Sequence, residues 1–218
     1  MVGLGCDNAK VNVGVDNGIA ALLKKNYCPY LKLNGCSAHL LTLTIKHAFD
    51  EYRTLEAFDE HIKAIYKFFS KSPSRLLDLQ KWFQFKGIKY HKLLTIFDIR
   101  WLSRFHSVSN YRSNLPAILD TLLKTSKDFT KHQKLRENSL ILYKETTKFE
   151  SIFLAYGLSD FLGSCKCISK IFQDSNLKLY AIYQTIQDLL KILSEAYGET
   201  KANISGPYYL EFQNLLEI

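Results

Sequence analysis

The first fifty residues carry two short alternating patterns, and a helical pattern follows each of them. Apolar residues alternate with glycine over residues 2–6 and alternate with other residues again over 31–35, so both stretches predict short strands. Helical spacing follows over about 11–25 and again from Ser37, which is predicted to cap the second helix. Strands that alternate with helices favour parallel pairing, and this part of the chain therefore predicts a small α/β unit.

From about residue 54 onward the spacing is helical and predicts no strand. Apolar positions recur every three or four residues over 58–69 and continue after the Ser-Pro-Ser break at 72–74. A long helix with one apolar face is predicted from Leu179 to Tyr197, and Gly198 is expected to end it.

The predicted fold class is α/β plus α, with an α/β piece over residues 1–55 and a helical domain over residues 56–218. Two strands do not make a stable sheet by themselves, and the chain begins directly inside the first predicted strand. We therefore expect a partial sheet whose first strands are missing, with an exposed edge that promotes self-association.

Composition adds a basic character and an intracellular expectation. The formal net charge is +8 and the pI is about 9.1, which favours polyanionic partners, nucleic acid first. No apolar run is long enough for a membrane helix, and the N-terminus does not read as a signal peptide. The five cysteines are odd in number and irregular in spacing, so we expect reduced, mostly buried thiols rather than a disulfide framework.

Two short motifs near the N-terminus carry candidate metal ligands. Asp7 follows the first strand, where α/β folds place carboxylates that bind Mg²⁺, but the motif by itself favours the alternative that Asp7 caps the next helix. Cys36 and His39 have the spacing of half a zinc site, but no second half at a persuasive spacing accompanies them. We therefore expect local packing rather than structural zinc at Cys36 and His39.

Residues 81–104 are dense in bases and aromatic residues. Six lysines and arginines face one acid there, Asp98, which gives +6 −1 = +5 of the excess charge of the chain. Cations contact phosphates and aromatic rings stack on exposed bases, so the segment is a candidate DNA contact. The alternative is a solvated lysine face over an aromatic core. The bases and aromatics are Lys81, Trp82, Phe83, Phe85, Lys86, Lys89, Tyr90, Lys92, Phe97, Arg100, Trp101 and Arg104.

Five motifs in order resemble the hAT-superfamily transposases, and especially the transposon-derived vertebrate proteins of zinc-finger or SUMO-ligase-like type. They are Gly5-Cys6-Asp7-Asn8-Ala9, Asn17-Gly18, Cys36-Ser37-Ala38-His39, Phe68-Phe69-Ser70-Lys71-Ser72-Pro73 and Arg100-Trp101-Leu102-Ser103-Arg104. The chain departs from the family pattern at Asn8, where glycine is usual, and at Ile99, where threonine is common.

The resemblance implies a partial RNase H-like fold interrupted by a large helical insertion. In that family an Asp-Asp-Glu triad holds two divalent metals, normally Mg²⁺. Asp7 matches the second aspartate, while the other two carboxylates would lie outside this chain, so Asp7 would bind metal only if they were supplied. Trp101 matches the tryptophan expected to stack on a flipped base, and Cys36 and His39 match a structural pair near the active site.

The expected function is that of a transposase-derived, DNA-associated protein of the nucleus or another intracellular compartment. This fragment is expected to be catalytically inactive and to hold no cofactor by itself. The expected DNA contacts are Lys89, Lys92, Arg100, Trp101 and Arg104. Two alternatives stay open: a piece of an active hAT transposase, and a protein-interaction scaffold without DNA binding.

Overall fold

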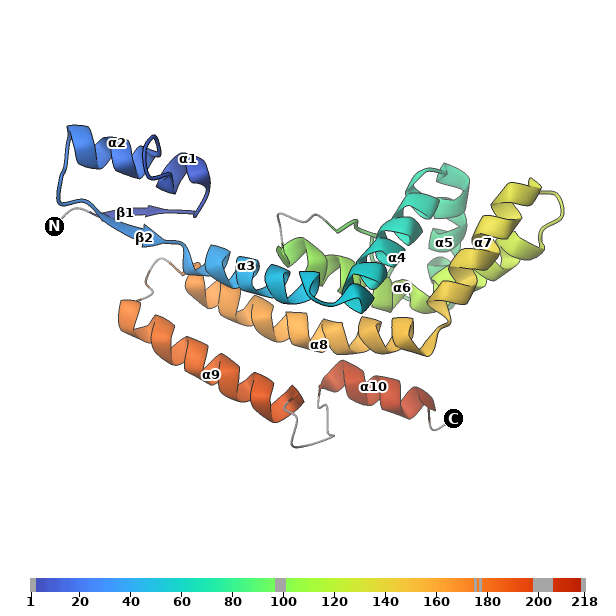
Figure 1. Ribbon diagram of the computed structural model, residues 1–218. Coiled ribbons are helices and arrows are strands. Elements are labelled where there is room, and N and C mark those ends of the chain that lie inside the picture. Colours follow the sequence, from blue (N-terminus) through green and yellow to red (C-terminus); the bar gives the residue numbers. More distant parts are fainter. Residues whose placement is uncertain (1–2, 97–100, 175, 177, 198–205, 217–218) are drawn as a thin grey trace.

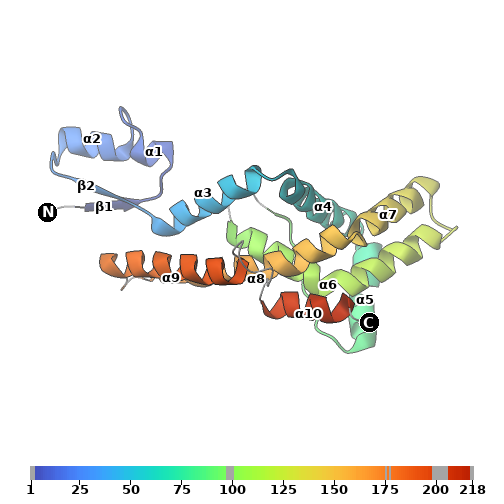
Figure 2. The same cartoon turned by 60° about the horizontal axis from the view of Figure 1, so that its bottom comes forward.

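The computed structural model describes residues 3–96, 101–174, 176, 178–197 and 206–216. Within these ranges the chain forms a small α/β unit at one end of an elongated body of helices (Figure 1). A second view, turned by 60°, shows the α/β unit again standing apart from the helices (Figure 2). The mostly helical chain with a small parallel sheet agrees with the predicted mixture of α/β and α structure.

The α/β unit contains the two predicted strands. In chain order its elements are β1 (Gly3–Cys6), α1 (Lys10–Val13), α2 (Ile19–Asn26) and β2 (Lys32–Gly35). The strands pair in parallel, with Gly3 opposite Lys32 and Cys6 opposite Gly35, which confirms the predicted pairing.

The prediction of a single helix over about 11–25 is wrong, because two glycines separate α1 from α2. Gly18 donates its backbone N–H to the Gly14 carbonyl at 3.0 Å, and an added Cβ at either glycine would collide with nearby backbone. This close approach of two backbone segments turns the chain between α1 and α2 and requires glycine at both positions.

Helix α3 (Ser37–Asp50) leaves the sheet and joins the helical body. Its residues Ile45 and Phe49 are buried in the core that the later helices form. The second half of α3 therefore packs on the helical body, although residues 1–55 were predicted to form the α/β piece. The predicted cap at Ser37 is also wrong. Cys36 occupies the N-cap position without a side-chain hydrogen bond, and its backbone N–H donates to the Cys6 carbonyl at 2.9 Å. That bond extends the pairing of the strands by one residue.

The body consists of helices, and beyond Gly35 no strand occurs in the described ranges. Its further helices are α4 (Arg53–Ser70), α5 (Pro73–Lys86), α6 (Trp101–Lys127), α7 (Gln133–Thr146), α8 (Phe149–Phe172), α9 (Leu179–Tyr197) and α10 (Pro207–Leu216). The predicted bounds of α9 are confirmed, while Gly198 lies outside the described residues.

Local signals explain where α5 begins and ends. The Ser72 hydroxyl accepts a hydrogen bond from the Arg75 backbone N–H, and proline occupies the first turn, as is usual at a helix start. Gly87 ends the helix with φ of +65°, and the Ile88 N–H donates to the Phe83 carbonyl at 3.1 Å. This left-handed glycine with a 6→1 hydrogen bond is a Schellman ending.

The core lies among α4, α6, α7 and α8, and α8 runs through the middle of it (Figure 1). Side chains spaced three or four residues apart bury one face of α4 and one face of α8. They are Phe58, Ile62, Ile65 and Phe69 on α4, and Ala155, Leu158, Leu162 and Cys165 on α8. Burying each large apolar side chain stabilises the fold by roughly 1.5–3 kcal/mol, so this body is the source of most stability.

The α/β unit buries little by comparison. Gly18, Ala20 and Leu31 are its buried residues among those described, whereas Val15 and Tyr30 are 90% and 84% exposed. Helices α1 and α2 lie beside the two strands (Figure 1) and bury few side chains there, and a pair of strands alone is marginal in water.

Two sequence-based expectations concern the surface. No helix within the described ranges combines the length and the apolar character needed to cross a membrane. All five cysteines are free, but the expectation that they are mostly buried is wrong. Cys165 alone is buried, while Cys36 and Cys167 are exposed.

Candidate nucleic-acid interface

The two N-terminal motifs meet at one edge of the sheet. Because β1 and β2 are parallel and end together at Cys6 and Gly35, the residues that follow them, Asp7 and Cys36, leave the sheet at the same edge. An added Cβ at Gly35 would lie 2.8 Å from the Asn8 side-chain oxygen, so glycine permits this close approach.

The Asp7 carboxylate serves the local backbone. It accepts hydrogen bonds from the Ala9 N–H at 3.1 Å and from the Asn12 side-chain amide at 2.5 Å. These bonds, with a smaller contribution from the charge of His39, hold the Asp7 pKa below its ordinary value. Among the described residues, no group of three or more His, Cys, Asp or Glu side chains is placed to hold a metal ion. Asp7 therefore stabilises the entry to α1 and contributes a single exposed carboxylate at the sheet edge.

A segment after α5 lies along α6 and presents the two predicted lysines. Side chains of α6 hold this segment by its backbone: Ser107 donates to the Thr95 carbonyl, Asn110 to the Lys92 carbonyl and Asn114 to the His91 carbonyl, at 2.9, 2.7 and 2.5 Å. Within this segment the side chains of Leu93 and Ile96 are buried, while Lys89 and Lys92 are exposed. We call residues 88–96 the α6 strap.

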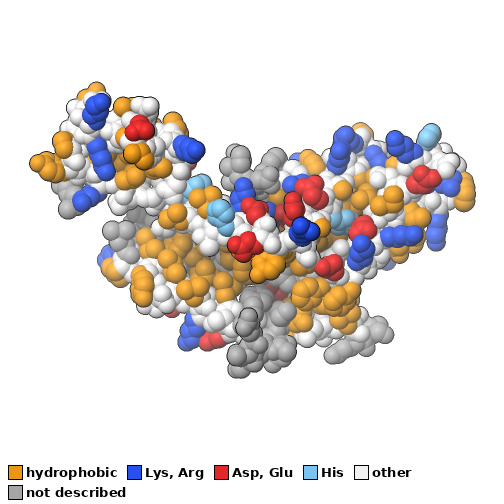
Figure 3. All heavy atoms as spheres, in the orientation of Figure 1, with side chains coloured by type: hydrophobic (Ala, Val, Ile, Leu, Met, Phe, Trp, Pro, Cys, Tyr) orange, Lys and Arg blue, Asp and Glu red, His pale blue; other side chains and the backbone are white. Residues whose placement is uncertain are grey.

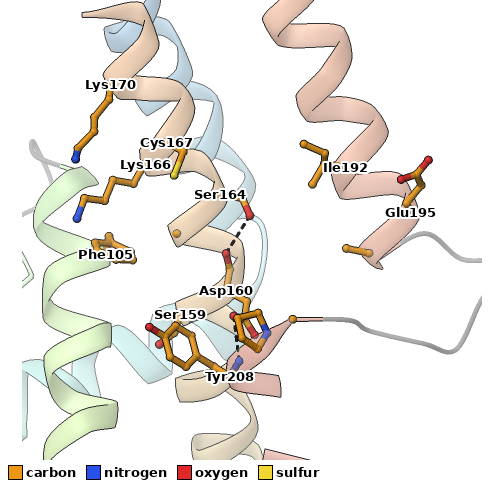
Figure 4. Close-up of a pocket in the computed structure, with 14 residues that line it drawn as sticks. Phe105, Ser159, Asp160, Ser164, Lys166, Cys167, Lys170, Ile192, Glu195 and Tyr208 are labelled. Atoms are coloured by element: carbon orange, nitrogen blue, oxygen red, sulfur yellow. Dashed lines mark hydrogen bonds between the residues drawn. The ribbon is translucent and has the colours of Figure 1, made fainter. Parts of the chain in front are cut away.

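Two lysines that the sequence interpretation missed lie on the other side of α6. Lys166 and Lys170 of α8 point toward α6, on the side of Phe105 (Figure 4). The Lys166 ammonium lies 4.3 Å from the centre of the Phe105 ring. Partial burial lowers the pKa of His106, and the charges of Lys166 and Lys170 lower it further. Both lysines therefore act electrostatically on the exposed side of α6.

The strap and α8 flank the same exposed stripe of α6. His106 and Asn110 are one helical turn apart and share a face of α6. Asn110 donates a hydrogen bond to the strap, and the charges of the α8 lysines lower the pKa of His106. The strap, which carries the exposed Lys89 and Lys92, thus lies on one side of this face, and Lys166 and Lys170 lie on the other. We call these four lysines the α6 basic stripe.

Arg104, one of the predicted DNA contacts, faces the core instead. Its side chain is 9% exposed and donates to one Asp59 carboxylate oxygen through Nε at 2.9 Å and Nη2 at 2.5 Å. Its guanidinium also lies over the Phe49 ring, 4.5 Å from the centre. A phosphate cannot reach Arg104 while this pair is intact. Arg100 and the side chain of Trp101 lie outside the described residues.

Some aromatic residues of the 81–104 segment belong to the core, and others are exposed and available for a DNA contact. Phe83 is buried in the core, and Trp82 and Tyr90 pack partly against it. Phe85 is exposed, and the Lys86 ammonium lies 5.9 Å from the centres of both the Trp82 and Phe85 rings. The cavity beside this face, of about 390 Å³, is lined by three lysines and three aspartates and carries no net positive charge. The α6 basic stripe is therefore the better candidate for a phosphate contact.

The comparison with known proteins leaves the site to be interpreted from its own chemistry. No protein-family model matches the chain, and no curated protein and no solved structure matches it. The sequence motifs and the geometry around α6 are therefore the two grounds for a functional proposal.

Proposed function

We propose that the chain is a DNA-associated protein of hAT-transposase descent, and that it contacts the DNA backbone through the α6 basic stripe. The observation that carries this proposal is that Lys166 and Lys170 lie beside the exposed His106 of α6, while the strap that bears the exposed Lys89 and Lys92 is bound to the same face at Asn110. The order of the five motifs supports the descent. The meeting of Asp7 with Cys36 at the end of two parallel strands agrees with a partial RNase H-like unit.

The stripe suits a phosphate backbone for electrostatic reasons. The two elements that carry these four lysines, α8 and the strap, flank a single helix, whose diameter with side chains is about 10–12 Å. Each ammonium that neutralises a phosphate releases a condensed counterion, so binding would weaken steeply with salt and would not depend on sequence. Arg100 and Trp101 precede the stripe along the chain and would supply a further phosphate contact and a base-stacking contact.

The test measures binding of a labelled DNA duplex by fluorescence anisotropy over a range of salt concentrations. Reversal of both α8 lysines, Lys166→Glu with Lys170→Glu, should weaken binding and reduce the slope of log affinity against log salt by about 2, since each phosphate contact contributes roughly 0.9. The matched control reverses Lys24 and Lys25, two exposed lysines that lie on α2. Equal losses from both double variants would show that net charge, rather than the stripe, governs binding.

Catalysis of transposition is not part of the proposal for this chain. One carboxylate, Asp7, cannot hold two metals and orient a nucleophile. We expect no strand cleavage with Mg²⁺ or Mn²⁺. Metal-dependent cleavage that Asp7→Ala abolishes would instead favour a piece of an active transposase.

A protein-interaction scaffold is the second candidate, and the exposed apolar side chains of the α/β unit favour it. Val15, Tyr27 and Tyr30 are each more than four-fifths exposed, and such surfaces are typical of contact sites. Absence of any salt-dependent DNA binding in the anisotropy assay would favour this candidate over the first.

A further inference from the structure

An apolar cavity of about 390 Å³ lies between α3, α8 and α9. Its deep part is formed by buried residues, among them Ile45 of α3, Cys165 of α8 and Leu189 of α9. Its rim is formed by Leu40 and Leu190, which are 48% and 54% exposed. Figure 3 shows hydrophobic side chains gathered between α3 and α9 on this face. The cavity is therefore a hollow that reaches into the core and opens at an apolar rim.

The lining of this cavity differs in kind from that of the other cavities. Among the described residues, its lining contains no charged side chain, whereas four further cavities of the chain are each lined by at least four charged residues. Its polar side chains are Ser37, Thr44 and Cys165. The Thr44 hydroxyl already donates to the Leu40 carbonyl at 3.1 Å, and burial raises the pKa of the Cys165 thiol to about 12, so that group stays neutral.

We propose that this cavity binds a small, uncharged, apolar molecule. Its volume falls within the range of ligand pockets, about 300–1,000 Å³. A dry cavity of roughly 150 Å³ already accepts benzene, so this one, at about 390 Å³, has room for a molecule of two or three rings or a short alkyl chain. Water is a poor occupant, because an ordered water needs two to four polar partners. A charged ligand is excluded by the cost of burying an unpaired charge.

A compact ligand fits the shape better than a helix from a second copy. A stable protein interface buries about 800 Å² on each partner over a continuous surface. Here the apolar area narrows from a rim at Leu40 and Leu190 to a buried floor at Ile45 and Leu189, which is the form of a pocket.

The probe is N-phenyl-1-naphthylamine, a neutral fluorophore with one naphthyl and one phenyl group, whose emission rises and shifts to the blue in apolar surroundings. Titration of the full chain should show saturable binding of one probe per chain, and 1-decanol should displace it. Leu190→Lys places a charge at the rim and should weaken probe binding roughly tenfold or more. The matched control is Ile192→Lys on the same helix, 50% exposed, which lines a different cavity and should leave binding unchanged.

Three results would overturn the proposal. The first is a lack of saturable probe binding, and the second is equal weakening by Leu190→Lys and Ile192→Lys. The third is a dimer, seen by sedimentation of the unlabelled chain, that Leu190→Lys dissociates and Ile192→Lys does not, since the hollow would then be an interface between copies. Circular dichroism and thermal melts of both variants ensure that the comparison is made between folded chains.

Discussion

Asp59 and Arg104 form an ion pair inside the helical body, and replacing Asp59 by alanine leaves a guanidinium buried without its carboxylate. The two side chains are 7% and 9% exposed, and both guanidinium contacts go to a single carboxylate oxygen. Removing one partner of a buried pair typically costs 3–5 kcal/mol, because the remaining charge stays desolvated. We therefore expect Asp59→Ala to lower the free energy of unfolding by about 3–5 kcal/mol, a large share of the stability of an ordinary domain.

Urea unfolding followed by circular dichroism measures this loss. The control is Asp120→Ala, which removes the partner of Lys124 in an exposed i,i+4 pair of α6 and should change the free energy of unfolding by at most about 0.5 kcal/mol. A second variant, Asp59→Leu with Arg104→Met, removes both charges and should recover much of the loss. If Asp59→Ala proves as mild as Asp120→Ala, the pair is solvated in solution, and Arg104 becomes available to a phosphate after all.

The remaining predictions concern three single positions. Gly206→Ala should lower the free energy of local unfolding of α10 by roughly 1–3 kcal/mol, because a Cβ there collides with the Asp160 carboxylate that accepts from the first N–H groups of α10. Hydrogen exchange of residues 208–216 measures this loss. The control is Gly157→Ala, where an added Cβ meets open space. Burial lowers the pKa of His61 from 6.5 to about 4. The neutral imidazole therefore contributes fully to the free energy of unfolding above pH 6.5, and this contribution, which approaches about 3 kcal/mol, is lost as the pH falls through about 4. His61→Gln should flatten the plot of unfolding free energy against pH over this range. Gly87→Ala should cost about 1 kcal/mol in a thermal melt, because φ of +65° disfavours a side chain; an unchanged melting temperature would contradict this conformation.

Local patterns in the sequence predicted the local parts of the fold. The parallel strands and the bounds of α9 follow from periodicity within a few residues of each position. The break between Gly14 and Gly18 did not follow, because it depends on the approach of two backbone segments. The packing of α3 on the helical body depends on the burial of Ile45 and Phe49 by residues far along the chain.

The candidate site shows the same division. Lys89 and Lys92 stand out in the sequence as part of a basic run, and both are exposed. Lys166 and Lys170 join them only through the packing of α8 on α6, although two lysines one turn apart on a largely apolar helix were a usable signal. Arg104 belongs to the same run but turns inward, since its partner Asp59 lies 45 residues earlier on another helix.

The attachment of the α6 strap has a consequence for how this region tolerates sequence change. Ser107, Asn110 and Asn114 supply the donors, while the strap supplies main-chain carbonyls, which every amino acid possesses. The exposed side chains of the strap, Ile88, Lys89 and Lys92, are thus free to diverge, provided that Tyr90, Leu93 and Ile96 keep their packing against the core. Charge could be added to or removed from this surface by substitution without rebuilding its support.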